Sequence, residues 1–296
     1  MLSEQTISSI ETLLAETDSA QGVVVQNGEV VIDWKTEESP VDVFAVQKGI
    51  LTILIGIAEE KYLLETLDHV NHHLDPEWTQ LSPWDEAKLS IETLLSMTTG
   101  MADDLSPLGE INQTWRYNNV AYNYLKQIIT LQSDMSLQTL SDEWLFKPLG
   151  MTQTTWVERE QKLPSGHSLS GLLSTARDLA QIGQLVLGKG SFAGEQILPS
   201  HYVDQMLSQT TTENPAWSWG WWNNHSDFYL SPMREAAGAI SGPLVSNAPN
   251  DLIASRGAYG NYLHIVPSME LVVVRTCKPG TVKPRAFEPM LWEALG

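Results

Sequence analysis

Lys48 stands three residues after Ala45 at the head of an apolar run, in the segment Phe44-Ala45-Val46-Gln47-Lys48. Residues three apart on a helix share a face, so a hydroxyl at position 45 would lie beside the Lys48 amine. That spacing is the Ser-x-x-Lys pattern of acyl-transfer sites, where an amine takes the proton of an attacking hydroxyl. Ala45 has no hydroxyl, so the segment keeps the base of this pattern and lacks its nucleophile.

The run that follows Lys48, from Gly49 to Ala58, is almost entirely apolar. It predicts a helix buried on nearly all sides, and burial would favour the neutral, basic form of the amine. The alternative is an ordinary core helix whose lysine extends to the surface. The segment by itself is compatible with both interpretations.

Composition limits the classes of protein to be considered. The chain has 296 residues, a formal net charge of -19 and a single cysteine, Cys277, which excludes an internal disulfide. The length allows one large domain or two joined lobes, and the acidity argues against nucleic acid or anionic membrane as partners. The segment Met1-Leu2-Ser3-Glu4-Gln5 lacks the basic and apolar regions of a signal peptide, and the longest apolar run is about half of a bilayer span. We therefore expect a cytoplasmic protein without a transmembrane segment.

Local signals place helices and strands near both ends of the chain. Ser3 can cap a helix to about Glu16, and two β-rich runs flank Asn27-Gly28, a pair that favours a tight hairpin turn. Thr175 and Asp178 form a capping pair for a helix to about residue 187. Strands are expected at 258–266 and 271–275, followed by a last helix at about 287–295.

The order of these elements predicts an α+β fold. Both chain ends contribute to one antiparallel sheet flanked by the N- and C-terminal helices, and the middle of the chain forms a mainly helical insertion. We expect a sheet lobe at about 1–60 and 235–296 and a helical lobe at about 61–234, within a single domain that spans 1–296. No repeat and no Ser/Gly-rich linker divides the chain.

Several segments together resemble one family in the order in which they occur. The chain is similar to the serine β-lactamase and penicillin-binding-protein superfamily, on its class C-like esterase and amidase branch, which includes the 6-aminohexanoate-dimer hydrolase type. The resemblance covers almost the whole chain and implies a β-lactamase/transpeptidase-like fold. The segments that carry it are FAVQK at 44–48, LLSMTTG at 94–100, YNN at 117–119, LFKPLGM at 145–151 and GLLSTARDL at 171–179.

The resemblance implies a two-step acyl transfer through an acyl-enzyme. Position 45 would hold the attacking serine, Lys48 would accept or relay its proton, and Tyr117 would pass a proton to the leaving group. Asn119 would orient these groups or the substrate. The alternative for 117–119 is a loop before a helix that starts near Val120, with Asn119 as its cap, and both interpretations can hold together.

A third element of that superfamily, Lys-Thr-Gly, is replaced here by Ser255-Arg256-Gly257-Ala258. Gly257 would let a substrate approach the strand closely, and the backbone N–H of Ala258 would form an oxyanion hole with that of residue 45. The lysine of the triplet is Ser255, which removes the group expected to bind a substrate carboxylate. Arg256 is expected to point to the opposite face of the strand.

Aromatic and acidic residues provide further candidates for the cavity wall. Trp221 belongs to a run of tryptophans at 217–222 that could wall an apolar pocket or could only bury area between lobes. Tyr259 and Tyr262 lie close to the expected oxyanion strand. Glu110 and Asp103-Asp104 could rim the cleft or belong to a solvated loop.

Three histidines raise a metal site as a hypothesis. His69, His72 and His73 fall in a helical register that would put His69 beside one of the other two. The run 67–74 stands where the similar proteins have a variable surface turn. We expect no metal and no cofactor.

Ala45 has two explanations, which lead to different functions. It is an inactivating replacement in a serine hydrolase, or it is the natural residue of a pseudoenzyme that binds a ligand or partner in the old cleft. A lyase or transferase acting through Lys48 and Tyr117, and a β-lactamase or D-amino-acid peptidase, are further alternatives. We favour a hydrolase of a small-molecule ester or amide in a form that lacks its nucleophile, because Lys48, Tyr117, Asn119 and Gly257 all remain.

Overall fold

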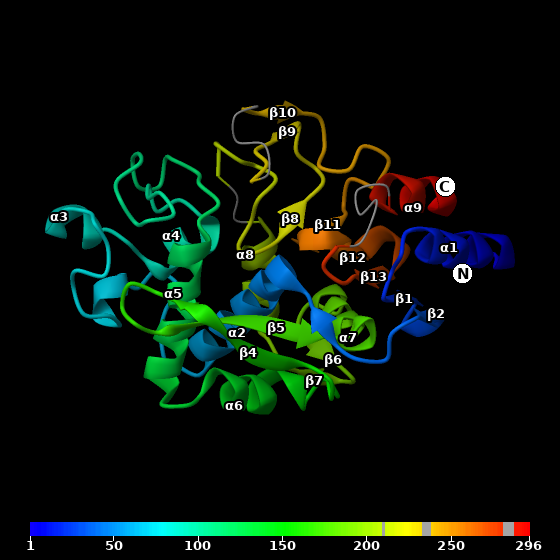
Figure 1. Ribbon diagram of the computed structural model, residues 1–296, viewed down its shortest axis with the longest axis horizontal. Coiled ribbons are helices and arrows are strands. Elements are labelled where there is room, and N and C mark those ends of the chain that lie inside the picture. The colour runs from blue at the N-terminus through cyan, green and yellow to red at the C-terminus, as the bar shows by residue number, and fades with distance from the viewer. Residues whose placement is uncertain (209–210, 233–237, 281–286) are drawn as a thin grey trace.

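The computed structural model describes residues 1–208, 211–232, 238–280 and 287–296 and centres on a six-stranded sheet (Figure 1). Its strand order is β2-β1-β13-β12-β11-β8, and each neighbouring pair is antiparallel. The strands are β1 (Gln21–Gln26), β2 (Glu29–Lys35), β8 (Trp222–Asn223), β11 (Ile253–Gly257), β12 (Asn261–Val266) and β13 (Leu271–Thr276). The predicted hairpin is confirmed: Asn27 and Gly28 join β1 and β2 with φ angles of 53° and 78°.

Helices cover both faces of this sheet. Gly22 of β1 stands opposite Arg275 of β13, and it faces Leu14 of α1 (Glu4–Glu16). Arg275 on that same face lies over Phe287, the first residue of α9 (Phe287–Leu295), at 4.7 Å. Val272, three residues away and so on the other face, contacts α7 (Ala176–Leu187). The predicted sheet flanked by the two terminal helices is therefore confirmed, and α7 completes the sandwich.

The rest of the chain forms the second part of the molecule around the helix that carries Lys48. A three-stranded sheet, in the order β3-β5-β4, lies beside it. These strands are β3 (Val41–Asp42), β4 (Thr155–Lys162) and β5 (Ser168–Ser174), and two further pairs are β6 (Ser191–Phe192) with β7 (Glu195–Gln196) and β9 (Phe228–Tyr229) with β10 (Ile240–Ser241). The helices are α2 (Gln47–Glu60), α3 (Pro83–Glu86), α4 (Ile91–Ser96), α5 (Asn119–Ser133), α6 (Leu137–Ser141) and α8 (Ser200–Ser208).

Helix α2 passes through the middle of the core. Every residue from Lys48 to Ala58 is buried. Gly49 permits this depth, because a Cβ there would lie 2.7 Å from the ring of Trp221. Within the described residues, no helix combines the length and apolarity needed to cross a membrane.

Two expectations from the sequence need adjustment. The strand expected at 258–266 begins only at Asn261, because Ala258–Gly260 (η5) form a turn in which Tyr259 and Gly260 have φ angles of 60° and 79°. The expected division of the lobes at 234/235 lies outside the described residues. Helix α7 falls within the range 61–234 assigned to the helical lobe, yet it packs on the large sheet.

Candidate active site

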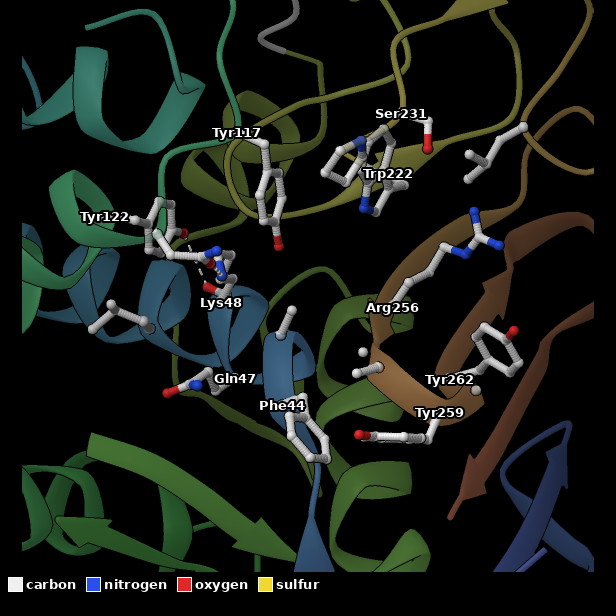
Figure 2. A pocket seen from close by; sticks show the side chains of 18 of the residues that line it. Phe44, Gln47, Lys48, Tyr117, Tyr122, Trp222, Ser231, Arg256, Tyr259 and Tyr262 are labelled. Carbon is white, nitrogen blue, oxygen red and sulfur yellow. Dashed lines mark hydrogen bonds between the residues drawn. The ribbon is translucent and has the colours of Figure 1, made fainter. Parts of the chain in front are cut away.

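A cavity of about 1230 Å³ lies between β11 and the helices that surround Lys48 (Figure 2). Tyr117 and Lys48 enter it from one side, and Arg256, Tyr259 and Tyr262 from the other. The cavity brings together seven of the eight predicted site residues. These are Ala45, Lys48, Tyr117, Asn119, Gly257, Ala258 and Tyr259.

Position 45 lies in a tight turn at the wall of the cavity. The 3-10 turn Phe44–Val46 (η1) leads directly into α2. Phe44 has a φ of 51°, which is unusual for a large side chain, and its N–H donates to Asp42 Oδ1 at 2.9 Å. Ala45 follows as a half-buried residue that lines the cavity. A side chain at this position therefore faces a ligand at the start of the helix.

Lys48 is held in place by neutral groups. Its Nζ donates to Asn119 Oδ1 at 2.7 Å and lies 4.8 Å from the ring centroid of Tyr117 and 5.5 Å from that of Tyr122. Burial lowers the pKa of Lys48 from its ordinary 10.5 to about 7. Near neutral pH a large fraction of the amine is therefore unprotonated and able to accept a proton.

Tyr117 has the complementary protonation state. Its ring packs edge-on against Trp217, with 5.4 Å between the ring centroids. Burial raises the pKa of the Tyr117 hydroxyl above its ordinary value, so the group keeps its proton near neutral pH. The cavity thus places a proton acceptor and a proton donor side by side.

Asn118, not Asn119, caps the helix that carries these groups. Asn118 Oδ1 accepts from the N–H of Ala121 at 2.9 Å, and its Nδ2 donates to the Ala102 carbonyl at 2.8 Å. Helix α5 therefore begins at Asn119, one residue earlier than expected, and the predicted cap at Asn119 is wrong. The Asn119 side chain is thereby left to bond Lys48.

Strand β11 lies directly against the backbone on both sides of Ala45. Ser255 Oγ donates to the Val46 carbonyl at 3.2 Å, and a Cβ on Gly257 would overlap the Val43 carbonyl oxygen. Glycine is therefore required for this approach. Arg275 Nη1 donates a hydrogen bond to the Gly260 carbonyl at 2.8 Å and so stabilises the turn Ala258–Gly260 that follows β11.

Arg256 lines the cavity although it points away from Ser255. Its guanidinium forms an ion pair with Glu288 of α9 and lies over the ring of Tyr262, 5.7 Å from the centroid. Strand β8 pairs with Ile253 and Ala254, and no described strand pairs with Arg256 on that side of β11. The alternation of side chains along a strand predicts that Arg256 lies outside the site, and this prediction is wrong.

Burial would raise the pKa of Glu288, but the charge of Arg256 and a bond to His264 together lower it. The Glu288 Oε1 to His264 Nε2 distance is 3.0 Å. Arg256 is thus neutralised within the protein, by a carboxylate that stays ionised.

Trp222 lines the cavity, whereas the predicted Trp221 does not. Trp221 is fully buried beneath α2, against Gly49, and does not line the cavity. Trp222 does line it and packs edge-on against Trp217 at 4.9 Å. Neighbouring strand residues face opposite ways, so the sequence could indicate that one of the pair faces the cavity but not which.

Of the acidic residues expected at the rim, Asp103 lines the cavity and pairs with Arg116 at 3.3 Å. Glu110 and Asp104 do not line it. The histidines also lie elsewhere: the ring centroids of His69 and His72 are 5.7 Å apart, and His73 Nε2 lies 3.1 Å from Asp68. In the described part of the chain, no three His, Cys, Asp or Glu residues form a group that could hold a metal ion.

Several cavity residues were not predicted from the sequence, among them Gln47, Lys126, Arg159 and Ser170. Lys126 is buried on α5, where its neighbours Leu125, Ile128 and Ile129 are buried too. A lysine within the apolar stripe of a helix was the signal that could have identified it. Arg159 is paired with Asp42.

Comparison with known proteins identifies a family and a shared fold. Residues 8–290 match the family model described as Beta-lactamase. No curated protein sequence matches the chain.

Several solved structures share the fold at low sequence identity. A Bacillus anthracis protein provisionally named a 6-aminohexanoate-dimer hydrolase has a TM-score of 0.71 and 18% identity, with 96% of this chain and 80% of that chain covered. The octameric penicillin-binding protein homologue from Pyrococcus abyssi has a TM-score of 0.71 and 16% identity, with 98% and 76% covered. A β-lactamase from Mycobacterium bovis has a TM-score of 0.70 and 16% identity, with 97% of each chain covered.

Proposed function

Because the chain belongs to the β-lactamase family, we propose that its cavity is the active site of an acyl-transfer hydrolase of small esters or amides, from which Ala45 removes the nucleophile. The observation that carries the proposal is the environment of Lys48. Its amine is buried, bonded to Asn119 rather than to a carboxylate, and has a pKa lowered to about 7 beside the position of the missing hydroxyl. A buried lysine of this kind is costly to maintain in a purely structural role.

With serine at position 45, the residues of the cavity account for each proton in the reaction. The serine oxygen would attack the carbonyl carbon of the substrate while its proton passes to Lys48. The oxyanion would lie at the backbone N–H groups of residue 45 and Ala258. Tyr117 would give a proton to the leaving alcohol or amine, and water would then release the acid from the acyl-enzyme.

The charges of the cavity favour a neutral carbonyl compound over a carboxylate. Both arginines in its wall are ion-paired, Arg159 with Asp42 and Arg256 with Glu288. Burial lowers the pKa of Lys48 to about 7, and it lowers the pKa of Lys126 well below the ordinary value. The two arginine charges are therefore balanced within the protein, and burial disfavours the charged form of both lysines.

The alanine itself favours a second candidate, a pseudoenzyme that binds a ligand in the same cleft. Ala45 lines a cavity whose other walls are complete, so a small ester or amide could bind and stay intact. This candidate predicts ligand binding by the chain as it stands and no gain of chemistry when the hydroxyl is restored.

The test is the intact mass of Ala45→Ser and of the unaltered chain after exposure to p-nitrophenyl acetate and to a chromogenic cephalosporin. We expect an acyl adduct or turnover with Ala45→Ser only, and with the ester. A matched control carries Ala45→Ser together with Lys48→Met, which keeps the hydroxyl and removes the base, and its reaction should be slower by several orders of magnitude. An adduct on the unaltered chain, or equal rates in the control, would contradict the proposal, and no reaction with either reagent would favour the pseudoenzyme.

A further inference from the structure

Lys126 is a second buried lysine in the wall of the cavity, and it connects three elements. Its Nζ donates to Gln47 Oε1 on α2 at 2.6 Å and to the Ser170 carbonyl on β5 at 2.7 Å. The ring of Trp156 lies 4.7 Å from the same nitrogen. No carboxylate among the described residues forms an ion pair with Lys126.

These contacts leave little of Lys126 for a ligand. Burial lowers the pKa of the Lys126 amine, and the charge of Lys48 lowers it further. The Lys126 amine donates to two acceptors within the protein, Gln47 Oε1 and the Ser170 carbonyl oxygen. The side chain is therefore satisfied inside the protein and acts through the groups that it holds.

The group that Lys126 holds toward the cavity is the amide of Gln47. Because Gln47 Oε1 accepts from Lys126, the amide NH₂ is the part that remains available. Gln47 is half-buried and lines the cavity, and none of the hydrogen bonds found in the described residues uses its Nε2. Figure 2 shows the Gln47 side chain below Lys48, with its amide end directed away from Phe44.

We propose that Gln47 Nε2 donates a hydrogen bond to a carbonyl or other neutral acceptor oxygen of a ligand in this cavity. Lys126 is the positioning residue that fixes the orientation of the Gln47 amide. Residues two apart on a helix face different directions, so the oxygen that Gln47 binds belongs to a group of the ligand that is distinct from the reacting carbonyl. The inference deepens the proposed function, because it specifies a second polar group on the small ester or amide.

The test uses the unaltered chain, in which Ala45 prevents cleavage, and three anilides measured by titration calorimetry. N-phenylpentanamide has only the scissile carbonyl. N-phenyl-4-oxopentanamide adds a ketone on the acyl side, and N-(4-acetylphenyl)pentanamide adds one on the amine side. We expect one of the ketones to bind on the order of threefold to tenfold more tightly than N-phenylpentanamide, as one neutral hydrogen bond provides.

The key variant is Gln47→Glu, which keeps the shape and the bond to Lys126 but replaces the donor by an acceptor. It should abolish the advantage of the ketone. Gln161→Glu, the same chemical change at an exposed residue of the cavity wall, is the matched control and should retain it. Lys126→Met should reduce the advantage, and it should have no further effect on selectivity when combined with Gln47→Glu.

The outcomes separate this inference from the proposed function. No ketone advantage in the unaltered chain, an advantage that survives Gln47→Glu, or no binding of any anilide would each overturn the role of Gln47. An advantage that Lys126→Met leaves undiminished would overturn the positioning role of Lys126. Acylation of Ala45→Ser is measured independently, so ketone selectivity without acylation refutes the hydrolase alone, and acylation without selectivity refutes the inference alone.

Discussion

Lys48→Met is the substitution that tests the central electrostatic argument, and its effect is calculable from the lowered pKa of Lys48. In the unfolded chain the amine has its ordinary pKa of 10.5, and in the folded protein its pKa is about 7. Between these two pH values the unfolded chain binds a proton that the folded chain does not. The free energy of unfolding must therefore rise with pH in this window, by about 1.4 kcal/mol per pH unit at most.

The buried Lys48 amine lowers the free energy of unfolding most below about pH 7. This effect disappears above pH 10.5, the pKa of the amine in the unfolded chain. From about pH 7 to about pH 9 the free energy of unfolding should rise by about 2 kcal/mol. This is less than the maximum slope would give, because the amine of the folded protein is still half-protonated at about pH 7. Methionine fills a similar volume and has no proton to bind. The unaltered chain should therefore gain about 2 kcal/mol of stability relative to Lys48→Met between these pH values.

The assay is urea unfolding followed by tryptophan fluorescence, with the difference in unfolding free energy measured at several pH values. Lys147→Met, at an exposed lysine, is the control and should give a difference that does not change with pH. Lys126 titrates in the same direction but is present in both proteins, so most of its contribution cancels. Parallel stability curves for the unaltered chain and Lys48→Met would refute the lowered pKa, and with it the base assigned to the cavity.

Two further predictions concern the restored enzyme, and a third concerns the stability of the fold. The rate of acylation of Ala45→Ser should rise with pH through about pH 7, as Lys48 loses its proton, and stopped-flow release of p-nitrophenol over pH 5 to 9 measures it; a rate independent of pH contradicts Lys48 as the base. Tyr117→Phe in that background should lower kcat for an anilide by on the order of 10² or more, with an unchanged melting temperature, and equal kcat values would remove Tyr117 from proton transfer. Gly257→Ala should cost about 1–3 kcal/mol of stability, because the added Cβ overlaps the Val43 carbonyl, and unaltered urea unfolding would show that β11 does not approach so closely.

The sequence predicted best those features that depend on neighbours along the chain. Ser3 and Thr175 accept hydrogen bonds from the N–H groups of Thr6 and Asp178, as N-caps do. The Asn27-Gly28 turn has the positive φ angles that the pair favours. Each of these depends on backbone conformation over two to four residues, so no distant contact can override it easily.

The cavity wall was predicted less completely, because distant contacts decide it. Arg256 lines the cavity and pairs with Glu288 of α9, a contact between distant segments that no local pattern shows. Lys126 lies in the wall because Gln47 and Ser170, far from it in the chain, provide its acceptors. The family segments predicted residues that the structure places around one cavity, but they did not indicate the other residues that line it.

The positive φ angles of two aromatic residues could not be predicted from the sequence either. Phe44 and Tyr259 both have positive φ angles, 51° and 60°, which bulky residues rarely adopt. Their rings meet at 5.3 Å between centroids, directly beside Ala45 and Ala258. Conformations of this kind cost on the order of 1–3 kcal/mol each and persist where the surroundings enforce them, often at functional sites. Here they flank the two residues assigned to the oxyanion hole.

Alanine at position 45 leaves the rest of this arrangement undisturbed, for a structural reason. The oxyanion donors assigned to the site are backbone N–H groups, which any residue at position 45 supplies. Lys48 bonds Asn119, and Gln47 bonds Lys126, so neither side chain depends on residue 45 for its position. Ala45→Ser adds one oxygen atom at a half-buried position on a cavity wall, which requires no repacking of the core. A failure of Ala45→Ser to react would therefore count against the chemistry assigned to the cavity rather than against its folding.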